Sequence, residues 1–228
     1  MRIFLSIVAV LFILGGGACA VPSLVTYRAL DGEGYISGSG AMSTTTAAFV
    51  TGTAEFEEVS QDEVEESSPD GSVRIRIAAE RTDGGEVLVA VGSAEAVQAL
   101  VVRGSHEIVN GLEFEPFDFD GVAVGGTRPL AIPEAGLFAV SSSGLGRQEI
   151  TWTVASGEWR AVIMNADGQP GVDVDVRFGV RFPYLRGFAI AGMVIGVVLI
   201  LAGVLWLAFL YRPGRRREPD PGAAVAPE

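Results

Sequence analysis

Apolar residues concentrate in two long runs near the ends of the chain. The run from Gly187 to Tyr211 contains no charged side chain. About 25 residues at ~1.5 Å rise per residue are long enough to cross a hydrocarbon core of ~30 Å. A helix also satisfies every backbone amide internally, as lipid requires. The pattern therefore predicts a transmembrane helix over 187–211.

The N-terminal run is open to three interpretations. A helix from about Ile3 to Val25 is long enough to span a membrane and remain uncleaved. Ala18-Cys19-Ala20 instead fits the small-residue pattern of a signal peptidase site. Cys19 could also be lipidated, although Gly16 stands where an aliphatic residue is expected. All three interpretations place the middle of the chain outside the cytoplasm.

The flanks and the small residues of the C-terminal run carry further information. By the positive-inside rule, a basic cluster marks the cytoplasmic end of this run, and it consists of Arg212, Arg215, Arg216 and Arg217. Gly192 and Gly196 have the GxxxG spacing that lets two helices approach closely, or they are ordinary lipid-compatible residues. The predicted organisation is an N-terminal helix or signal peptide over 1–25, an extracytoplasmic domain over 26–186, the spanning helix, and a disordered tail over 212–228.

The middle of the chain alternates with period two, which is typical of strands. Val73, Ile75 and Ile77 share one face of a predicted strand, and the intervening arginines share the other. A near-continuous apolar run predicts a more buried strand over 86–91. Ser93 is placed to cap a short helix over 94–101. Further strands are expected over 49–55, 121–124, 137–141 and 149–154, and the acidic residues 56–72 are predicted to form a solvated loop.

The last two predicted strands form the clearest pattern in the chain. The segment 158–164 leads into Asn165-Ala-Asp-Gly168, and 171–182 returns with alternating apolar and charged residues. Because Asp-Gly accommodates a positive φ, the pattern predicts a β-hairpin. Several short strands with glycine-rich turns predict a mainly β fold, an antiparallel, jelly-roll-like β-sandwich flanked by N- and C-terminal transmembrane helices.

The stretch SGEWRAVIMNADGQPGVDVDVRFGVRFPYL, together with YRALDGEGY, carries a resemblance. The chain resembles a family of uncharacterised actinobacterial membrane proteins in which an N-terminal helix, an acidic Gly-Tyr segment and a β-rich ectodomain precede a transmembrane helix. The resemblance implies this architecture and no activity. More distantly, the last strands resemble those of prepeptidase C-terminal and carbohydrate-binding sandwiches.

The charge narrows the range of partners. The formal net charge is −12, and all 16 basic residues are arginine. The acidic middle argues against nucleic acid, which requires clustered basic residues. Cys19 is the only cysteine, so the middle domain can contain no disulfide.

Histidine chemistry has little support in the sequence. His106 is the only histidine, and no GxSxG turn accompanies it. A histidine-pair metal site is therefore excluded, and a Ser-His-Asp triad has no sequence support. We predict that His106 is a structural loop residue.

The candidates for metal or sugar binding are acidic and aromatic. Glu113, Glu115, Asp118 and Asp120 alternate with phenylalanines and could offer oxygens to Ca²⁺, although a wet strand face explains them equally well. Asp167 is interpreted as a turn former, and Asp173 and Asp175 as solvent-facing. Trp152 shares the apolar phase of its strand and is predicted to lie in the core, whereas Trp159 could pack there or stack on a sugar.

The resulting functional expectation is a non-enzymatic membrane protein that presents its β domain outside the cytoplasm as an envelope interaction or accessory protein. Its partners would be the lipid bilayer and another membrane or envelope protein, with no cofactor and no nucleic acid. The alternatives are a sensor module that binds Ca²⁺ or carbohydrate and a membrane-tethered hydrolase.

Overall fold

The computed structural model describes residues 2–56, 72–114 and 117–211. The chain divides into two compact units. Residues 28–187 contain the strands, and the flanking residues form a helical unit of their own.

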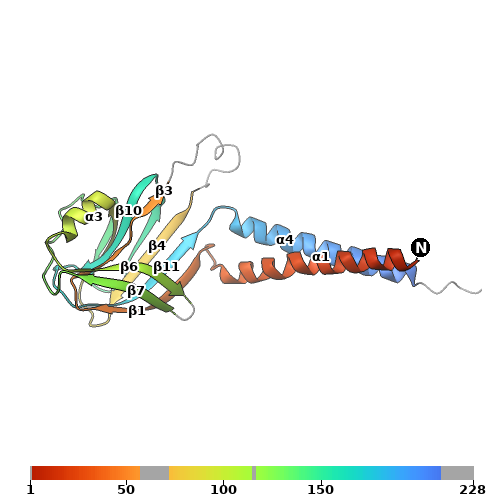
Figure 1. The fold of residues 1–228 in the computed structure, drawn as a ribbon, viewed down its shortest axis with the longest axis horizontal. Coiled ribbons are helices and arrows are strands. Elements are labelled where there is room, and N and C mark those ends of the chain that lie inside the picture. Colours follow the sequence, from red (N-terminus) through yellow and green to blue (C-terminus); the bar gives the residue numbers. More distant parts are fainter. Residues whose placement is uncertain (1, 57–71, 115–116, 212–228) are drawn as a thin grey trace, which may run out of the picture. The chain divides into compact units, whose positions relative to one another are not determined.

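The first sheet of the β domain has four antiparallel strands in the order β1-β11-β4-β9 (Figure 1). They are β1 (Ile36–Thr44), β11 (Val172–Arg181), β4 (Arg74–Arg81) and β9 (Gln148–Thr153). Along β11, buried valines alternate with exposed Asp173 and Asp175. One face of this sheet therefore meets the core and the other meets water.

The second sheet has seven strands. Its main order is β7-β6-β2-β10-β5-β8, with β3 also paired to β10. The strands are β2 (Ala48–Thr51), β3 (Ala54–Phe56), β5 (Val87–Ser93), β6 (His106–Phe114), β7 (Phe117–Val124), β8 (Val140–Gly144) and β10 (Gly157–Asn165). Because β2 and β6 pair in parallel, the prediction of a wholly antiparallel fold is wrong at this point.

The two sheets share one apolar core. Met42 and Val174 of the first sheet belong to the same buried cluster as Phe49, Val89 and Ile163 of the second. Burial of these apolar side chains away from water is the main driving force for folding. The core accounts for the alternation in β11, because only every second side chain of that strand reaches it.

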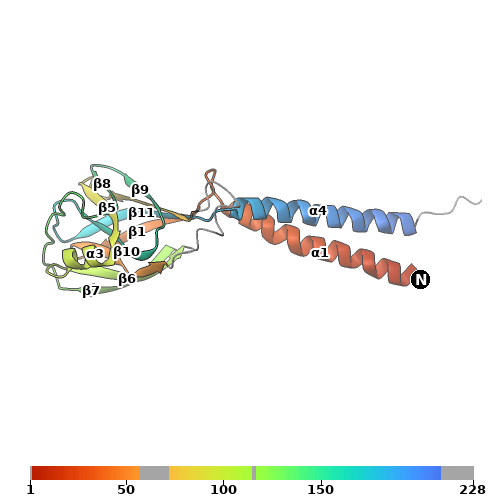
Figure 2. The same ribbon diagram turned by 90° about the horizontal axis from the view of Figure 1, so that it is seen from above.

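The outer face of the second sheet is also covered. Helix α3 (Ala94–Val101) packs Val97 and Val101 against Val162 and Met164 of β10, and Leu130 completes this second cluster. The predicted cap is confirmed, because Ser93 Oγ accepts a hydrogen bond from Ala96 N at 3.3 Å. The helix lies over β10 and β5 (Figure 2). Both faces of β10 are therefore buried along its second half.

The predicted terminal hairpin is wrong, although both of its strands exist. Strand β10 belongs to the second sheet and β11 to the first, so the turn after Asn165 connects the two sheets instead of closing a hairpin within one sheet. Buried Asn165 donates its side-chain amide to Gln169 O at 2.9 Å and Gly171 O at 3.3 Å. Gly168 has φ +71°, and a Cβ there would lie 2.3 Å from Leu130 O. The turn is thus shaped by tertiary contacts as well as by Asp-Gly.

Other strand predictions are corrected in extent. The strand expected over 49–55 is two strands, β2 and β3, and the one expected over 121–124 begins at Phe117. The strand expected over 137–141 begins at Val140. Strands β1 and β6 were not predicted, because ISGSGAMST is poor in β-branched residues and β6 contains a bulge near Gly111. The acidic loop over 57–71 and the tail over 212–228 lie outside the described residues.

The helical unit consists of α1 (Arg2–Ala29) and α4 (Leu185–Leu210). Two segments, Val10–Ala29 and Leu185–Leu210, are long and apolar enough to cross a membrane. The helices meet through small residues. A Cβ on Gly196 would lie 2.6 Å from Gly16 O and 2.7 Å from Ala20 Cβ, and one on Gly192 would lie 2.2 Å from Ser23 Oγ. Glycine is therefore needed at position 196, where a side chain would meet backbone atoms of α1, whereas at position 192 a side chain would meet only the Ser23 side chain, which can rotate.

Candidate functional site

The two ends of the β domain emerge side by side. Strands β1 and β11 pair from Ile36 with Val180 onward, so the segment that enters β1 and the segment that leaves β11 lie at the same end of the first sheet. A tight turn precedes β1, in which Asp31 Oδ1 accepts hydrogen bonds from Glu33 N at 2.9 Å and Tyr35 N at 2.8 Å. This turn brings two carboxylates and an aromatic ring over the sheet.

Arg76 of β4 is the centre of this arrangement. Its guanidinium lies 3.9 Å from the centroid of the Tyr35 ring, and it donates a hydrogen bond to Glu33. Two further carboxylates form ion pairs with Arg76: Asp31 Oδ2 lies 3.9 Å from its Nη1, and Glu149 Oε1 lies 3.6 Å from its Nε. Burial alone would lower the pKa of Arg76, but the hydrogen bond that it donates to Glu33 and the surrounding negative charges raise that pKa above its ordinary value. The cluster ties the turn before β1 to β4 and β9.

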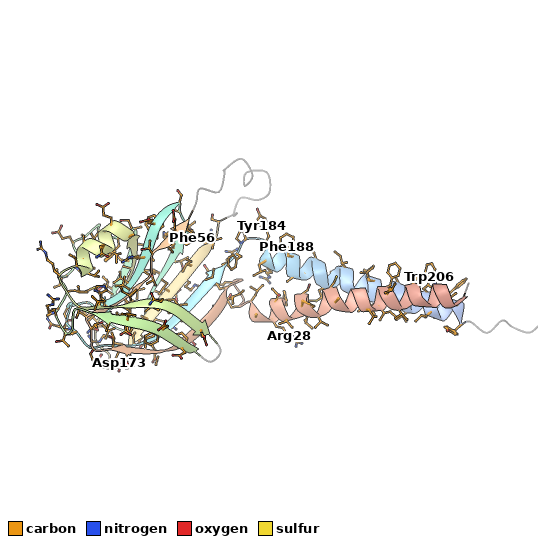
Figure 3. All side chains as sticks on the ribbon, in the orientation of Figure 1. Arg28, Phe56, Asp173, Tyr184, Phe188 and Trp206 are labelled. Atoms are coloured by element: carbon orange, nitrogen blue, oxygen red, sulfur yellow. The ribbon has the colours of Figure 1, made fainter. Side chains whose placement is uncertain are left out.

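A cavity of ≈ 230 Å³, here called the Arg181–Arg186 cavity, opens beside that turn. Arg181, at the end of β11, and Arg186, near the start of α4, line it together with Glu33, Phe182 and Tyr184. Arg186 Nη1 donates to Gly32 O at 3.5 Å. Tyr184, labelled in Figure 3, has φ +68°, the one positive φ of a non-glycine residue in the described ranges. Such a conformation is costly for a residue with a Cβ, and it shapes the short connection between β11 and α4.

The acidic candidates lie on the β6–β7 hairpin. Glu113 is paired directly with Asp118, and Asp120 with Gly111, and the three acids are exposed. Glu115 lies outside the described residues. Within the described part of the chain, no three His, Cys, Asp or Glu side chains converge as a metal site would require. The intervening Phe119 instead makes an edge contact with Phe49 at 5.6 Å, so the alternation reflects one buried face and one wet face.

The remaining acidic candidates, Asp167, Asp173 and Asp175, have different local contacts. Asp167 Oδ1 accepts a hydrogen bond from Gln169 N at 3.0 Å, within the turn between the sheets. Asp173 accepts one from Thr82 Oγ1 at 2.8 Å, and Asp175 is exposed on the wet face of β11. These contacts agree with turn-forming and solvent-facing interpretations.

His106 is not a loop residue. It begins β6 and is 7% exposed, on the face of the second sheet that lies opposite to Val109. Burial lowers its pKa below the ordinary value, the Arg160 charge lowers it further, and a hydrogen bond with the Gly104 backbone acts in the opposite sense. Its Nδ1 is buried without a hydrogen-bond partner among the described atoms. No group of three His, Cys, Asp or Glu side chains that could hold a metal ion occurs in the described ranges, and His106 is a buried side chain at the start of β6.

Both tryptophans of the β domain belong to its core. Trp152 is 8% exposed, and its ring centroid lies 5.1 Å from that of Trp159 and 5.9 Å from that of Phe56. Trp159 Nε1 donates to Ser156 O at 3.2 Å. Trp159 packs against the shared core, so no exposed aromatic pair is available there for a sugar ring.

The candidates in and beside the two apolar helices are the two glycines of α4, Cys19 and the C-terminal arginines. Gly192 and Gly196 lie against α1, with Gly196 buried. Cys19 is exposed. Arg212, Arg215, Arg216 and Arg217 lie outside the described residues.

Sequence reasoning did not find the Arg76 cluster or the Arg181–Arg186 cavity. Asp-Gly-Glu-Gly-Tyr is a recognisable turn sequence, but nothing local links Tyr35 to Arg76, which lies 41 positions later in the sequence. Register alone brings them together, through β11. No protein-family model matches the chain, and no curated protein matches it.

Proposed function

We propose that the protein crosses the membrane twice and presents its β domain outside the cytoplasm as a non-enzymatic interaction or accessory module of the cell envelope. In this topology α1 is retained as the partner of α4, and the arginines after Leu210 remain in the cytoplasm. Membership of the actinobacterial family that the chain resembles is part of the same proposal.

The strand order supports the finer description of the β domain as a jelly-roll sandwich. When β3 and the β6–β7 hairpin are set aside as additions, the remaining eight strands fall into two four-stranded sets, β1-β11-β4-β9 and β2-β10-β5-β8. The chain changes sheet at almost every step between them. Such a sandwich has a well-filled core and exposed sheet faces and loops, which is suited to binding other molecules by its surface.

The single observation that carries the proposal is the pairing of β1 with β11. Because these neighbours are the first and last strands, both connections to the helices leave the same end of one sheet. The connections are short, Leu30–Tyr35 before β1 and Phe182–Tyr184 after β11. A domain tethered twice at one end is held near the bilayer rather than on a long stalk.

The packing of α1 on α4 supports retention of the N-terminal helix. In lipid, helices associate through close backbone approach at small residues rather than through the hydrophobic effect. Gly16 and Gly196 provide such an approach, because a Cβ on either would lie 2.6 Å from the carbonyl oxygen of the other. A cleaved signal peptide would have no need of this fit.

An epitope tag placed before Met1 tests retention directly. We expect the tag to remain on the membrane-embedded protein at its full length, as seen by immunoblot of washed membranes. A shortened protein without the tag would show cleavage, whether or not Cys19 is lipidated. A variant with Ala18→Leu, which removes a small residue of the cleavage pattern at an exposed position, is the control and should migrate identically.

The orientation is tested with a reporter that matures only in the cytoplasm. We expect activity when it is fused after Arg217 and none when it is inserted near Gly144, at the end of β8. The reverse pattern would overturn the topology.

The accessory role is tested by capture of the detergent-solubilised protein followed by quantitative mass spectrometry. An unrelated two-span protein with the same tag and expression level is the control. We expect enrichment of one stable membrane or envelope partner relative to that control. Equal recovery of all proteins in the two samples would count against an accessory role.

A further inference from the structure

We infer that the Arg181–Arg186 cavity binds the phosphodiester headgroup of an anionic phospholipid, such as phosphatidylglycerol, from the outer leaflet. The inference rests on the proposed membrane topology, and it adds a specific lipid contact to it. All residues that line the cavity belong to the β domain, 28–187.

The first argument is charge. The chain carries a net charge of −12, yet the lining of the cavity contains two arginines and one carboxylate. Arg181 and Arg186 both line the cavity, and Arg74 lies directly across from Arg181 in the β4–β11 pair. The one carboxylate in the lining, Glu33, forms an ion pair with Arg76. The cavity therefore favours an anion, and paired guanidinium groups suit the oxygens of a phosphate.

The second argument is the apolar part of the lining. Phe182 is 48% exposed and Tyr184 is 41% exposed, and both lie in the connection from β11 to α4. Aromatic side chains are favoured at the level of lipid headgroups, where one part of the ring meets hydrocarbon and another meets water. A free phosphate ion would gain nothing from these rings, whereas the glycerol and upper acyl carbons of a lipid would cover them.

The third argument is the position of the lining residues in the sequence, directly before the apolar run of α4. Gly187, which lines the cavity, is followed immediately by Phe188 and an uncharged run that continues to Leu210. If that run spans the bilayer, residues 181–187 are at the level of the phosphates, because little chain separates them from the hydrocarbon. Lipid phosphate is thus present at this depth at high local concentration.

The test uses the full chain in nanodiscs, with Trp206→Phe so that fluorescence reports Trp152 and Trp159 of the β-domain core. The melting temperature is compared between discs of phosphatidylcholine alone and discs that also contain phosphatidylglycerol. A ligand that binds only the folded state raises the melting temperature, by on the order of 5 °C for a domain of this size at high occupancy. We expect that rise for the parent protein and its loss in Arg181→Gln/Arg186→Gln.

The matched control removes the same charge elsewhere. Arg103→Gln/Arg147→Gln changes two exposed arginines that do not line the cavity, and it should retain the full rise in anionic discs. An equal loss in this control would overturn the site, because it would show a general effect of surface charge. The single variant Arg186→Gln, at an exposed position, should reduce the rise even if the double variant does not fold.

Free phosphate is separated from lipid by adding glycerol phosphate to the phosphatidylcholine discs. We expect it to produce less than half of the rise, since it lacks the apolar contacts. An equal rise would overturn the assignment to lipid. Failure of the membrane proposal is distinguished from failure of the lipid site by a separate measurement. Extraction of the protein from native membranes by alkaline carbonate would contradict the membrane proposal. A parent protein that stays in the membrane and shows no rise in melting temperature in anionic discs would contradict the lipid site alone.

Discussion

The last two strands of the β domain have similar lengths and very different surroundings. In β11, valines that face the shared core alternate with exposed acidic and basic residues. In the second half of β10, residues on both faces are buried, because α3 covers the side that faces away from the core. A strand with one wet face tolerates charge at every second position, whereas a strand between two apolar layers tolerates it at none.

The comparison also explains the local chemistry of the two sheets. The wet face of the four-stranded sheet carries the Arg76 cluster and Arg181, one of the two arginines that line the cavity. The covered face of the seven-stranded sheet carries His106, whose pKa is lowered by burial. Charged groups on the wet face of the first sheet are accessible to ligands, whereas His106 is buried.

A charge in the covered strand should have the largest effect. Val162→Asp places a carboxylate in a fully buried position between β10 and α3, and we expect a loss of more than about 4 kcal/mol of unfolding free energy, or no folded protein. Asp175→Ala, on the wet face of β11, should change it by less than about 0.5 kcal/mol. Urea unfolding followed by fluorescence in the Trp206→Phe protein measures both. Equal effects would show that α3 does not cover β10.

The second largest loss of unfolding free energy is expected where edge strand β1 of the first sheet packs against edge strand β7 of the second. Gly40 of β1 lies under the ring of Phe117 from β7, and a Cβ there would lie 2.0 Å from that ring. We expect Gly40→Ala to cost about 1–3 kcal/mol through overpacking. Gly111→Ala, where the space is open, should cost less than about 1 kcal/mol in the same urea titration. A larger loss at Gly111 would contradict this packing.

The cluster on the wet face should contribute less. Arg76→Gln removes the contact with the Tyr35 ring and the ion pairs to three acids, and we expect a loss of about 1 kcal/mol. Part of that difference should disappear in high salt, because these pairs are partly exposed. Arg76→Lys keeps the charge but not the planar fork, so its stability should be intermediate. A difference that is independent of salt would argue that packing, not charge, dominates.

The smallest expected effect is a pH dependence of folding stability that comes from buried His106. Burial lowers the pKa of His106 in the folded state, so the unfolded chain binds more protons as the pH falls below about 6.5. Folding stability should therefore be fully present above the unfolded pKa and be lost as the pH falls toward the folded one. His106→Gln should flatten this part of the profile measured by urea titration at several pH values. An unchanged slope would assign it to other groups.

Much of the local structure could be predicted because it depends on short-range patterns. Alternation identified β11, the apolar run identified β5, and Ser93 identified the start of α3. The prediction was poorer where small residues form a strand, as in β1, since Gly and Ser carry little periodic signal. His106 was misjudged because burial of a polar side chain depends on residues that are distant in the sequence, and His106 is 7% exposed in the folded domain.

The sequence by itself determined the two apolar helices, the strands with one wet face and the short helix, because length, periodicity and capping act within a few residues. Only the tertiary structure decided which strands are neighbours. Asn165-Ala-Asp-Gly168 reads as a hairpin turn, yet it carries the chain from one sheet to the other. Strand β11 pairs instead with β1 and β4, which are far away in the sequence. Pairing follows the burial of a shared core, a property of all the strands together. The same pairing brings the connections to the two apolar helices, together with Arg76 and Tyr35, to one end of the domain.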